Sequence, residues 1–96
     1  MKFIISYDIS NSYKRKEISD FLISCNFIRI QKSVFLGEIK TEILIGKISI
    51  FESFLSDKKD SILISPLCKE DFFKSCFLGQ TFDINHFETF KKFILF

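Results

Sequence analysis

The residues most suited to chemistry lie close together near the start of the chain. Asp8 ends an apolar run that begins at Phe3, and the basic triplet Lys14-Arg15-Lys16 follows shortly after it. Carboxylate oxygens are preferred ligands of Mg²⁺, and lysine and arginine bind phosphate groups. This arrangement predicts a divalent metal held beside a phosphate. The alternative is that Asp8 only forms the turn that leads into a helix, as Asp and Ser often do.

A single carboxylate leaves such a metal site incomplete. Mg²⁺ in proteins usually takes one or two carboxylates together with water molecules and phosphate oxygens. In a two-fold symmetric dimer every site is repeated, so two Asp8 side chains can lie near one another. A metal ion held there would polarise a phosphodiester and lower the pKa of a bound water molecule.

The basic triplet contradicts a local rule of helix stability. Residues 14–16 fall in the first turn of a predicted helix, where the macrodipole is positive and each cation costs roughly a few tenths of a kcal/mol. A broken local rule can mark a functional site, and the backbone N–H groups at the helix start would help these side chains to bind an anion. Glu17 works modestly against this, and a solvated basic turn is the alternative interpretation.

The composition predicts one small domain. The chain has 96 residues, 47% of them hydrophobic, and its formal net charge of +2 is too small to indicate a nucleic-acid binder by itself. Residues 1–40 hold seven Lys/Arg against four Asp/Glu (+3), and residues 41–96 hold seven against eight (−1). The three cysteines form no C-x-x-C pair, and no apolar run is long enough for a signal peptide or a membrane span. We expect a cytoplasmic protein with reduced cysteines and no membrane partner.

The apolar pattern predicts an α+β chain in the order β-α-β-α-β-β with a terminal strand. The predicted strands are 2–8, 27–36, 61–66, 72–78 and 92–96. Gly37 is interpreted as the break after the second of them. With two helices between these strands, the order favours a ferredoxin-like βαββαβ sandwich, one mainly antiparallel sheet with both helices on one face.

The two predicted helices differ in how clear their signals are. The first covers residues 13–25, with Asn11 or a neighbouring serine as its cap and Asn26 as a left-handed terminator. The second covers residues 41–55, but Gly46 costs about 1 kcal/mol in a helix interior. Its β-branched residues also suit a strand, which is the alternative interpretation.

Side-chain alternation predicts one apolar and one half-polar face of the sheet. In the first predicted strand, Phe3, Ile5 and Tyr7 share one face, and Ile4, Ser6 and Asp8 share the other. In the second, one face holds Ile28, Ile30, Val34 and Leu36, and the other holds Phe27, Arg29, Gln31, Ser33 and Phe35. In the third, Ile62 and Ile64 lie opposite Ser61, Leu63 and Ser65. Packing the apolar sets on the helices leaves Asp8, Arg29 and Gln31 on the other face. Lys32 breaks the pattern, which predicts a bulge or a strand break. The half-polar face suits an interface between two copies of the domain.

Three segments of the chain carry a family resemblance. They are Tyr-Asp-Ile-Ser at 7–10, Phe-Ile-Arg-Ile-Gln-Lys-Ser-Val-Phe-Leu-Gly at 27–37, and Asp-Ser-Ile-Leu-Ile-Ser-Pro-Leu-Cys at 60–68, with Arg15 after the first. Together they resemble the CRISPR-associated protein 2 family, the small subunit of the spacer-acquisition integrase. The resemblance runs from residue 2 to about residue 79 with compatible spacing.

This resemblance implies a face-to-face homodimer of single ferredoxin-like domains. Residues 1–79 would be the core, and residues 80–96 an extension that adds a strand to the partner's sheet. The resemblance also implies that Asp8 binds Mg²⁺ (or Mn²⁺) at the dimer interface. The further catalytic-site residues that it implies are Tyr7, Arg15, Arg29 and Phe35, with Ser33 nearby. The expected contacts to the nucleic-acid backbone are Lys14, Arg15, Lys16, Arg29 and Lys32.

Family members are described as metal-dependent endonucleases on single-stranded RNA or on DNA, and as a scaffold for spacer DNA. The expected function is therefore CRISPR adaptation, in which the homodimer and the large integrase subunit bind spacer-precursor duplex DNA. A Mg²⁺-dependent, phosphodiester-cleaving site is expected at the dimer interface. The alternatives are a purely structural DNA-binding adaptor and a stand-alone toxin-type ribonuclease of the virulence-associated D type. Some members have a second arginine at the position of Glu17, whose loss here lowers the phosphate affinity expected of this chain.

Overall fold

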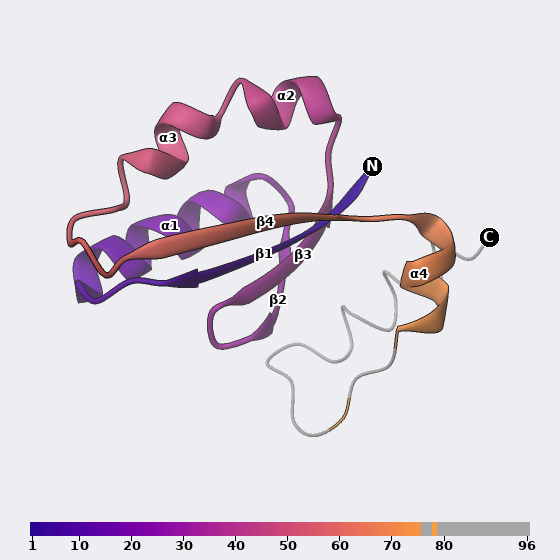
Figure 1. The fold of residues 1–96 in the computed structure, drawn as a ribbon, viewed down its shortest axis with the longest axis horizontal. Helices are drawn as coiled ribbons and strands as arrows, with labels where there is room; N and C mark the ends of the chain where they lie inside the picture. The colour runs from indigo at the N-terminus through magenta and orange to yellow at the C-terminus, as the bar shows by residue number, and fades with distance from the viewer. Residues whose placement is uncertain (76–77, 79–96) are drawn as a thin grey trace.

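The computed structural model, which describes residues 1–75 and 78, contains one four-stranded antiparallel sheet (Figure 1). Its strands are β1 (Lys2–Asp8), β2 (Ile28–Gln31), β3 (Val34–Glu38) and β4 (Ser61–Leu67), in the spatial order β2-β3-β1-β4. Helix α1 connects β1 to β2, and helices α2 and α3 connect β3 to β4. This is the ferredoxin-like βαββαβ sandwich that the sequence predicts, and β1 is at its centre.

Helix α1 (Ser12–Ser24) begins and ends at the predicted signals. The Asn11 side chain accepts a hydrogen bond from the backbone N–H of Lys14 at 3.0 Å, which satisfies one of the free donors at the helix start. Asn26, with φ of 66°, takes the left-handed conformation that ends the helix. The expected stripe faces the sheet, since Ile18 and Leu22 are buried there.

The second helical segment is interrupted at the glycine that weakens its prediction. Helix α2 (Thr41–Ile45) ends at Gly46, and helix α3 (Ile48–Glu52) begins after Lys47. Leu44 and Phe51 nevertheless both reach the core, one from each helix. The helical interpretation is therefore confirmed, and the strand alternative for this segment is wrong.

The segment predicted as a strand at 72–78 begins instead as a helix. Helix α4 (Lys69–Lys74) has Cys68 at its N-cap, where the thiol accepts a hydrogen bond from the Asp71 N–H at 3.4 Å. Acidic residues in its first turn and Lys74 in its last turn complement the helix dipole. Paired aromatics favour a strand, but these capping and charge signals outweigh them. Residues 76 and 77 lie outside the described part of the chain.

The predicted second strand is two strands joined in a tight hairpin. The register shifts between Arg29 and Gln31, and Lys32 and Ser33 form the turn between β2 and β3. This confirms the break predicted from Lys32. Gly37 does not mark a break, because it lies inside β3 opposite Phe3. A Cβ atom at this position would come within 2.5 Å of the Phe27 ring, so the close approach of that ring explains the glycine.

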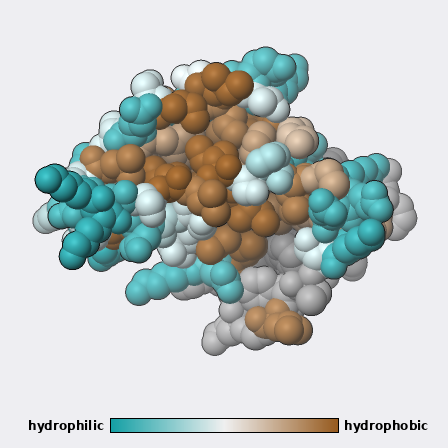
Figure 2. All heavy atoms as spheres, in the orientation of Figure 1, coloured by the Kyte–Doolittle hydropathy of each residue, from teal (hydrophilic) through white to brown (hydrophobic). Residues whose placement is uncertain are grey.

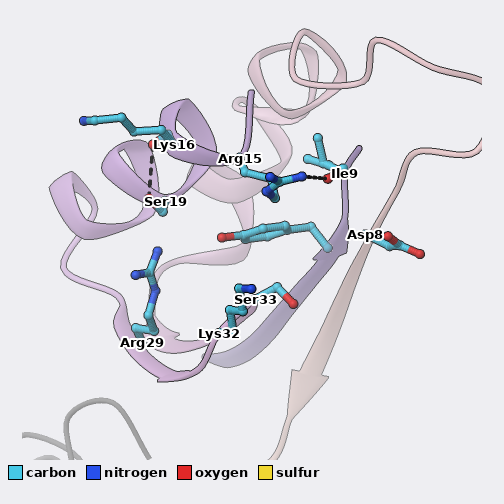
Figure 3. Close-up of a pocket in the computed structure, with 9 residues that line it drawn as sticks. Asp8, Ile9, Arg15, Lys16, Ser19, Arg29, Lys32 and Ser33 are labelled. Carbon is cyan, nitrogen blue, oxygen red and sulfur yellow. Dashed lines mark hydrogen bonds between the residues drawn. The ribbon is translucent and has the colours of Figure 1, made fainter. Parts of the chain in front are cut away.

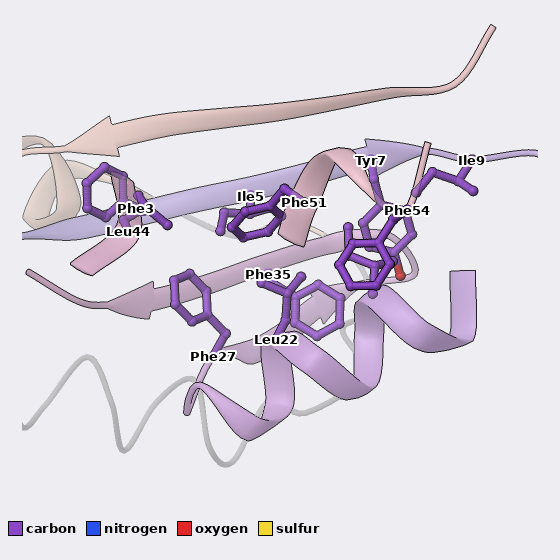
Figure 4. Close-up of a cluster of buried hydrophobic side chains, with 11 residues drawn as sticks. Phe3, Ile5, Tyr7, Ile9, Leu22, Phe27, Phe35, Leu44, Phe51 and Phe54 are labelled. Carbon is purple, nitrogen blue, oxygen red and sulfur yellow. The ribbon is translucent and has the colours of Figure 1, made fainter. Parts of the chain in front are cut away.

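The main core lies between the sheet and the helices α1, α2 and α3 (Figure 4). It is built largely of aromatic and branched side chains: Phe3, Ile5, Tyr7, Ile9, Ile18, Leu22, Phe27, Phe35, Leu44, Phe51 and Phe54. The opposite face, which we call the open face, is covered at one end by Phe72 of α4. That ring packs on Leu36 and Ile30 in a second, smaller cluster.

One sequence-based assignment of faces is wrong. Phe35 pairs with Ile5 and is fully buried on the helix face, and Arg29 pairs with Phe35. Arg29 therefore lies on the helix face, whereas Val34 and Leu36 lie with Ile4 on the open face. The alternation itself is as expected. Its assignment to faces depends on which residue of β3 pairs with Ile5, and local sequence does not determine that pairing.

An exposed apolar surface also extends over α2, α3 and β4 (Figure 2). The exposed large side chains on the helix side are Ile43, Ile45, Ile48, Ile50 and Leu55, all at least 39% exposed. Leu63 of β4 is 63% exposed and lies on the open face, since it pairs with Ser6. Exposed apolar side chains of this kind suit contacts with protein rather than with phosphate.

Several predictions fall on residues outside the described part of the chain. They are the terminal strand at 92–96 and the extension at 80–96, so the division into a core of residues 1–79 and an extension stays a prediction. Within residues 1–75 and 78, no helix combines the length and the apolar character that crossing a membrane requires.

Candidate functional site

The end of β1 sends two neighbouring side chains to opposite faces of the sheet. Tyr7 points to the helix face, where its ring stacks on Phe35 with 6.2 Å between the ring centroids. Asp8 is exposed and pairs across the sheet with Ser61 of β4. Figure 3 shows the Asp8 carboxylate pointing away from Arg15, Arg29 and Lys32. The predicted site residues are therefore divided between two faces.

The Asp8 carboxylate can act as an oxygen ligand to Mg²⁺, but it has no further ligating side chains grouped around it within the described residues. Within the described residues, no three His, Cys, Asp or Glu side chains come together as a metal site. No hydrogen bond or ion pair joins the Asp8 carboxylate to another described side chain. Mg²⁺ accepts one or two carboxylates and completes its shell with water and phosphate. Asp8 alone could therefore supply one carboxylate ligand to such a metal ion, and the prediction that it binds Mg²⁺ or Mn²⁺ stays a prediction.

The remaining predicted site residues line or support an open pocket on the helix face. This pocket, which we call the cation pocket, has a volume of about 640 Å³. It is lined by Tyr7, Asp8, Ile9, Arg15, Lys16, Ser19, Arg29, Lys32 and Ser33. The Arg29 guanidinium lies over the Phe35 ring, 5.0 Å from its centroid. Phe35 is fully buried, so it supports Arg29 from below and is not itself accessible to a ligand.

Arg15 fixes the loop between β1 and α1. Its Nη1 donates hydrogen bonds to the carbonyl oxygens of Ile9 at 2.9 Å and Ser10 at 2.8 Å. These bonds hold the guanidinium beside the end of β1 and limit its rotamers. Arg15 is consequently a preorganised cation at the rim of the cation pocket, as well as a structural clamp on the loop.

The predicted backbone-binding lysines have different surroundings. Lys14 forms an ion pair with Glu17 at 3.6 Å, and Lys16 forms one with Asp20 at 2.7 Å. Exposed pairs of this kind contribute about 0–1 kcal/mol, so a phosphate can displace either partner at low cost. Lys32 is exposed in the hairpin turn, and no ion pair joins it to another described residue. Their assignment as nucleic-acid contacts stays a prediction.

Asp60 is a structural residue that the sequence reasoning did not single out. Its carboxylate accepts hydrogen bonds from the backbone N–H groups of Ser10, Ser56 and Asp57, at 2.9 to 3.1 Å, and from the Ser10 hydroxyl. These bonds, led by that from Ser10, lower the pKa of Asp60 from 3.8 to about 2. They tie the loop after β1 to the loop before β4. The sequence feature that points to this structural role is the position of Asp60 directly before a strand, where an aspartate can form an Asx-type turn.

The comparisons with known proteins agree on one family. The family model described as CRISPR associated protein Cas2 matches residues 1–75. A protein of Korarchaeum cryptofilum named CRISPR-associated endoribonuclease Cas2 is 28% identical over 71 residues, which cover 74% of this chain and 76% of that protein.

Two solved structures share the fold. The Cas2 structure from Streptococcus pyogenes has a TM-score of 0.71 and 19% identity, and covers 82% of this chain and all of that chain. A hypothetical protein from Thermus thermophilus has a TM-score of 0.67 and 22% identity, and covers 83% of this chain and 92% of that one. At these identities the likeness supports the fold, and the family assignment rests on the sequence model.

Proposed function

Since the chain belongs to the CRISPR-associated protein Cas2 family, we propose that it acts in CRISPR adaptation as a homodimer with a Mg²⁺-dependent phosphodiester-cleaving site at Asp8. Membership of this family supports the role in adaptation. The name of the Korarchaeum relative, an endoribonuclease, supports the cleavage of nucleic acid. The large integrase subunit and spacer-precursor duplex DNA are the proposed partners, and single-stranded RNA is a further candidate substrate.

The observation that carries the proposal is the position of Asp8 on the open face. This face combines polar side chains with apolar ones, and Leu63 on it is 63% exposed. A second copy packed there would cover Leu63 and bring two Asp8 carboxylates to one interface. Mg²⁺ or Mn²⁺ bound between them would stabilise charge on the phosphodiester and activate water.

A second candidate function, the purely structural adaptor, is favoured by one observation. The cations Arg15 and Arg29 lie on the helix face, away from the carboxylate that would hold the metal. In this case the protein binds duplex DNA and presents it to the large integrase subunit, and cleavage is not part of its role.

Cleavage assays on the full chain separate the two candidates. Labelled single-stranded RNA and duplex DNA are incubated with Mg²⁺, with Mn²⁺ or with EDTA, for the wild type, Asp8→Asn and Glu52→Gln. Glu52 is an exposed acid on α3 and serves as the matched control. For a nuclease, EDTA and Asp8→Asn each lower the rate by about two orders of magnitude, and Glu52→Gln does not. Cleavage that survives Asp8→Asn contradicts the metal site. Duplex binding without any cleavage by the wild type supports the adaptor.

A further inference from the structure

The connection between β1 and α1 is short, and each of its residues is held by a separate contact. Strand β1 ends at Asp8, and residues 9–11 lead directly into α1. The first of them, Ile9, is buried in the main core. The last, Asn11, caps the first turn of α1. Ser10 between them is exposed, so polar contacts rather than packing hold it in place.

Two side chains of opposite charge hold the backbone of Ser10. The Asp60 carboxylate accepts hydrogen bonds from the Ser10 N–H at 2.9 Å and from its hydroxyl at 3.0 Å. The Arg15 guanidinium donates to the carbonyl oxygen of Ser10 at 2.8 Å and to that of Ile9 at 2.9 Å (Figure 3). An anion on the N–H and a cation on the C=O both match the polarity of the backbone, and hydrogen bonds to charged groups are the stronger kind. We call these two side chains the Ser10 clamp.

The Asp60 side of the Ser10 clamp is itself anchored. Its second carboxylate oxygen accepts a hydrogen bond from the backbone N–H of Ser56 at 2.9 Å. The residue directly after Asp60 is Ser61, which pairs with Asp8 between β4 and β1. Asp60 therefore fixes the end of β1 in two ways, through its bonds to Ser10 and through the strand that begins beside it.

A fixed backbone at this point matters for a carboxylate that binds metal. Mg²⁺ requires oxygen ligands at about 2.0–2.1 Å in nearly ideal octahedral geometry. Asp8 is exposed, and no hydrogen bond joins its carboxylate to another side chain in the part of the chain that the structure describes. The backbone at the end of β1 therefore sets where this carboxylate can reach. In a two-fold symmetric dimer, any error in that position is repeated in the partner.

We infer that Asp60 and Arg15 are positioning residues for Asp8, and that the Ser10 clamp places its carboxylate for metal binding. The inference rests on the proposed function, because it concerns the same metal site. Neither side chain has to touch the metal, since both act through the residues that follow Asp8. Arg15 also lines the cation pocket, whereas Asp60 does not. Substitution of Asp60 consequently tests the clamp without removing a cation from that pocket.

The test uses the full chain without nucleic acid and compares two serines that bond to the same carboxylate. Asp60→Asn keeps the shape of the side chain but turns one acceptor oxygen into an amide that only donates. Ser10→Ala removes the hydroxyl bond between Asp60 and the residues after β1. Ser56→Ala removes the hydroxyl bond to the other carboxylate oxygen, at 3.3 Å and within the loop before β4, and is the matched control. Asp8→Asn identifies the Mn²⁺ that binds at Asp8.

Mn²⁺ affinity is measured by calorimetry at a protein concentration at which sedimentation velocity shows a dimer for every variant. We expect Asp60→Asn to weaken Mn²⁺ binding about tenfold, the lower end of the effect that outer partners of metal ligands have. Ser10→Ala is expected to weaken it about threefold and Ser56→Ala less than twofold. A residue that only stabilises the fold would not separate the two serine variants, because each loses one hydroxyl bond to Asp60. Equal effects of the two, or an unchanged affinity in Asp60→Asn, overturn the inference.

NMR relaxation of the metal-free protein separates a failure of the inference from a failure of the proposed function. The backbone order parameters of Asp8 and Ile9 are expected to fall in Asp60→Asn and in Ser10→Ala, and to stay unchanged in Ser56→Ala. If the wild type and Asp8→Asn bind Mn²⁺ equally, the proposed metal site fails, and lowered order parameters still support the Ser10 clamp. If Mn²⁺ binds at Asp8 and the order parameters of Asp60→Asn match those of the wild type, the inference fails alone.

Discussion

The two faces of the sheet are built from the same strands but have different physical tasks. The helix face is packed with aromatic rings, and its cations are fixed by contacts to those rings and to backbone carbonyls. The open face carries Asp8, serines and a few aliphatic side chains, and among residues 1–75 and 78 it is Phe72 that covers one end of it. One face is a packed core, and the other is the surface at which we propose that a second copy binds.

This difference originates in the alternation of a single strand. Tyr7 and Asp8 are neighbours, yet the first closes the core and the second is exposed on the open face. A change at Tyr7 therefore acts on folding and on the cation pocket. A change at Asp8 acts on whatever the open face binds. Variants that act on one face alone test whether the separation holds.

The largest expected effect tests which face forms the interface of the proposed homodimer. Leu63→Glu places a carboxylate on the open face, where a second copy would bury it without a partner. We expect dimerisation to weaken by about 3 kcal/mol, roughly a hundredfold, because a desolvated charge is costly. Sedimentation velocity over a range of protein concentrations measures the dimerisation constant.

Ile45→Glu is the matched control for this prediction. Ile45 lies on α2 and is 64% exposed, against 63% for Leu63, so both substitutions add the same charge at equal exposure. Only the side of the sheet differs. If Ile45→Glu dissociates the dimer and Leu63→Glu does not, the helix side is the interface and Asp8 has no second carboxylate beside it.

A smaller effect is expected from methyl groups added at two glycines. Gly37→Ala brings a Cβ within 2.5 Å of the Phe27 ring on the helix face, and we expect a loss of about 1–3 kcal/mol. Gly46→Ala meets only carbonyl oxygens at 3.4 Å or beyond, and is expected to stabilise α2 by up to about 1 kcal/mol. Urea unfolding of both variants measures the difference. Equal stability of the two would show that the helix face is not tightly packed.

The sequence predicted the elements whose signals are local. Strand β1, helix α1 with its Asn11 cap and the left-handed Asn26 all follow from neighbouring residues. The second helical segment was also recognised, because Leu44 and Phe51 share one stripe despite Gly46. The prediction of a strand at residues 72–74 is wrong, because the Cys68 cap and the charge order of α4 favour a helix there.

The arrangement of the candidate site depended on information that is not local. The alternation of β2 and β3 was visible, but the face that holds Arg29 follows from the pairing of Ile5 with Phe35. The hairpin turn and the register shift set only the pairing of Arg29 with Phe35, whereas Ile5 and Phe35 pair between strands that are distant in the sequence. The sequence therefore indicated the right residue types, and it grouped Arg29 with Asp8 on the wrong side.

The smallest expected effect lies at Asp60, which joins the ends of β1 and β4 and so serves both faces. Its hydrogen bonds are made to the ionised carboxylate and lower its pKa to about 2, below the ordinary value of 3.8. A depressed pKa means that protonation opposes folding. The stabilisation is therefore complete above about pH 4 and is lost as the pH falls through about 2. We expect Asp60→Asn to lower the midpoint of urea unfolding at pH 6.

The difference in unfolding midpoint between the wild type and Asp60→Asn, followed against pH, shows whether the charge of Asp60 or its shape holds the loops. If the ionised carboxylate holds the two loops, the wild type and Asp60→Asn differ most above pH 4, and the difference disappears as the pH falls through about 2, because Asp60 becomes protonated there. A difference that stays constant from pH 6 to pH 2 contradicts this, and indicates that asparagine fails for steric reasons. Because Asp8 pairs with Ser61, the residue directly after Asp60, convergence would also show that one ionised side chain helps to position the end of β1 from which Asp8 and Tyr7 diverge.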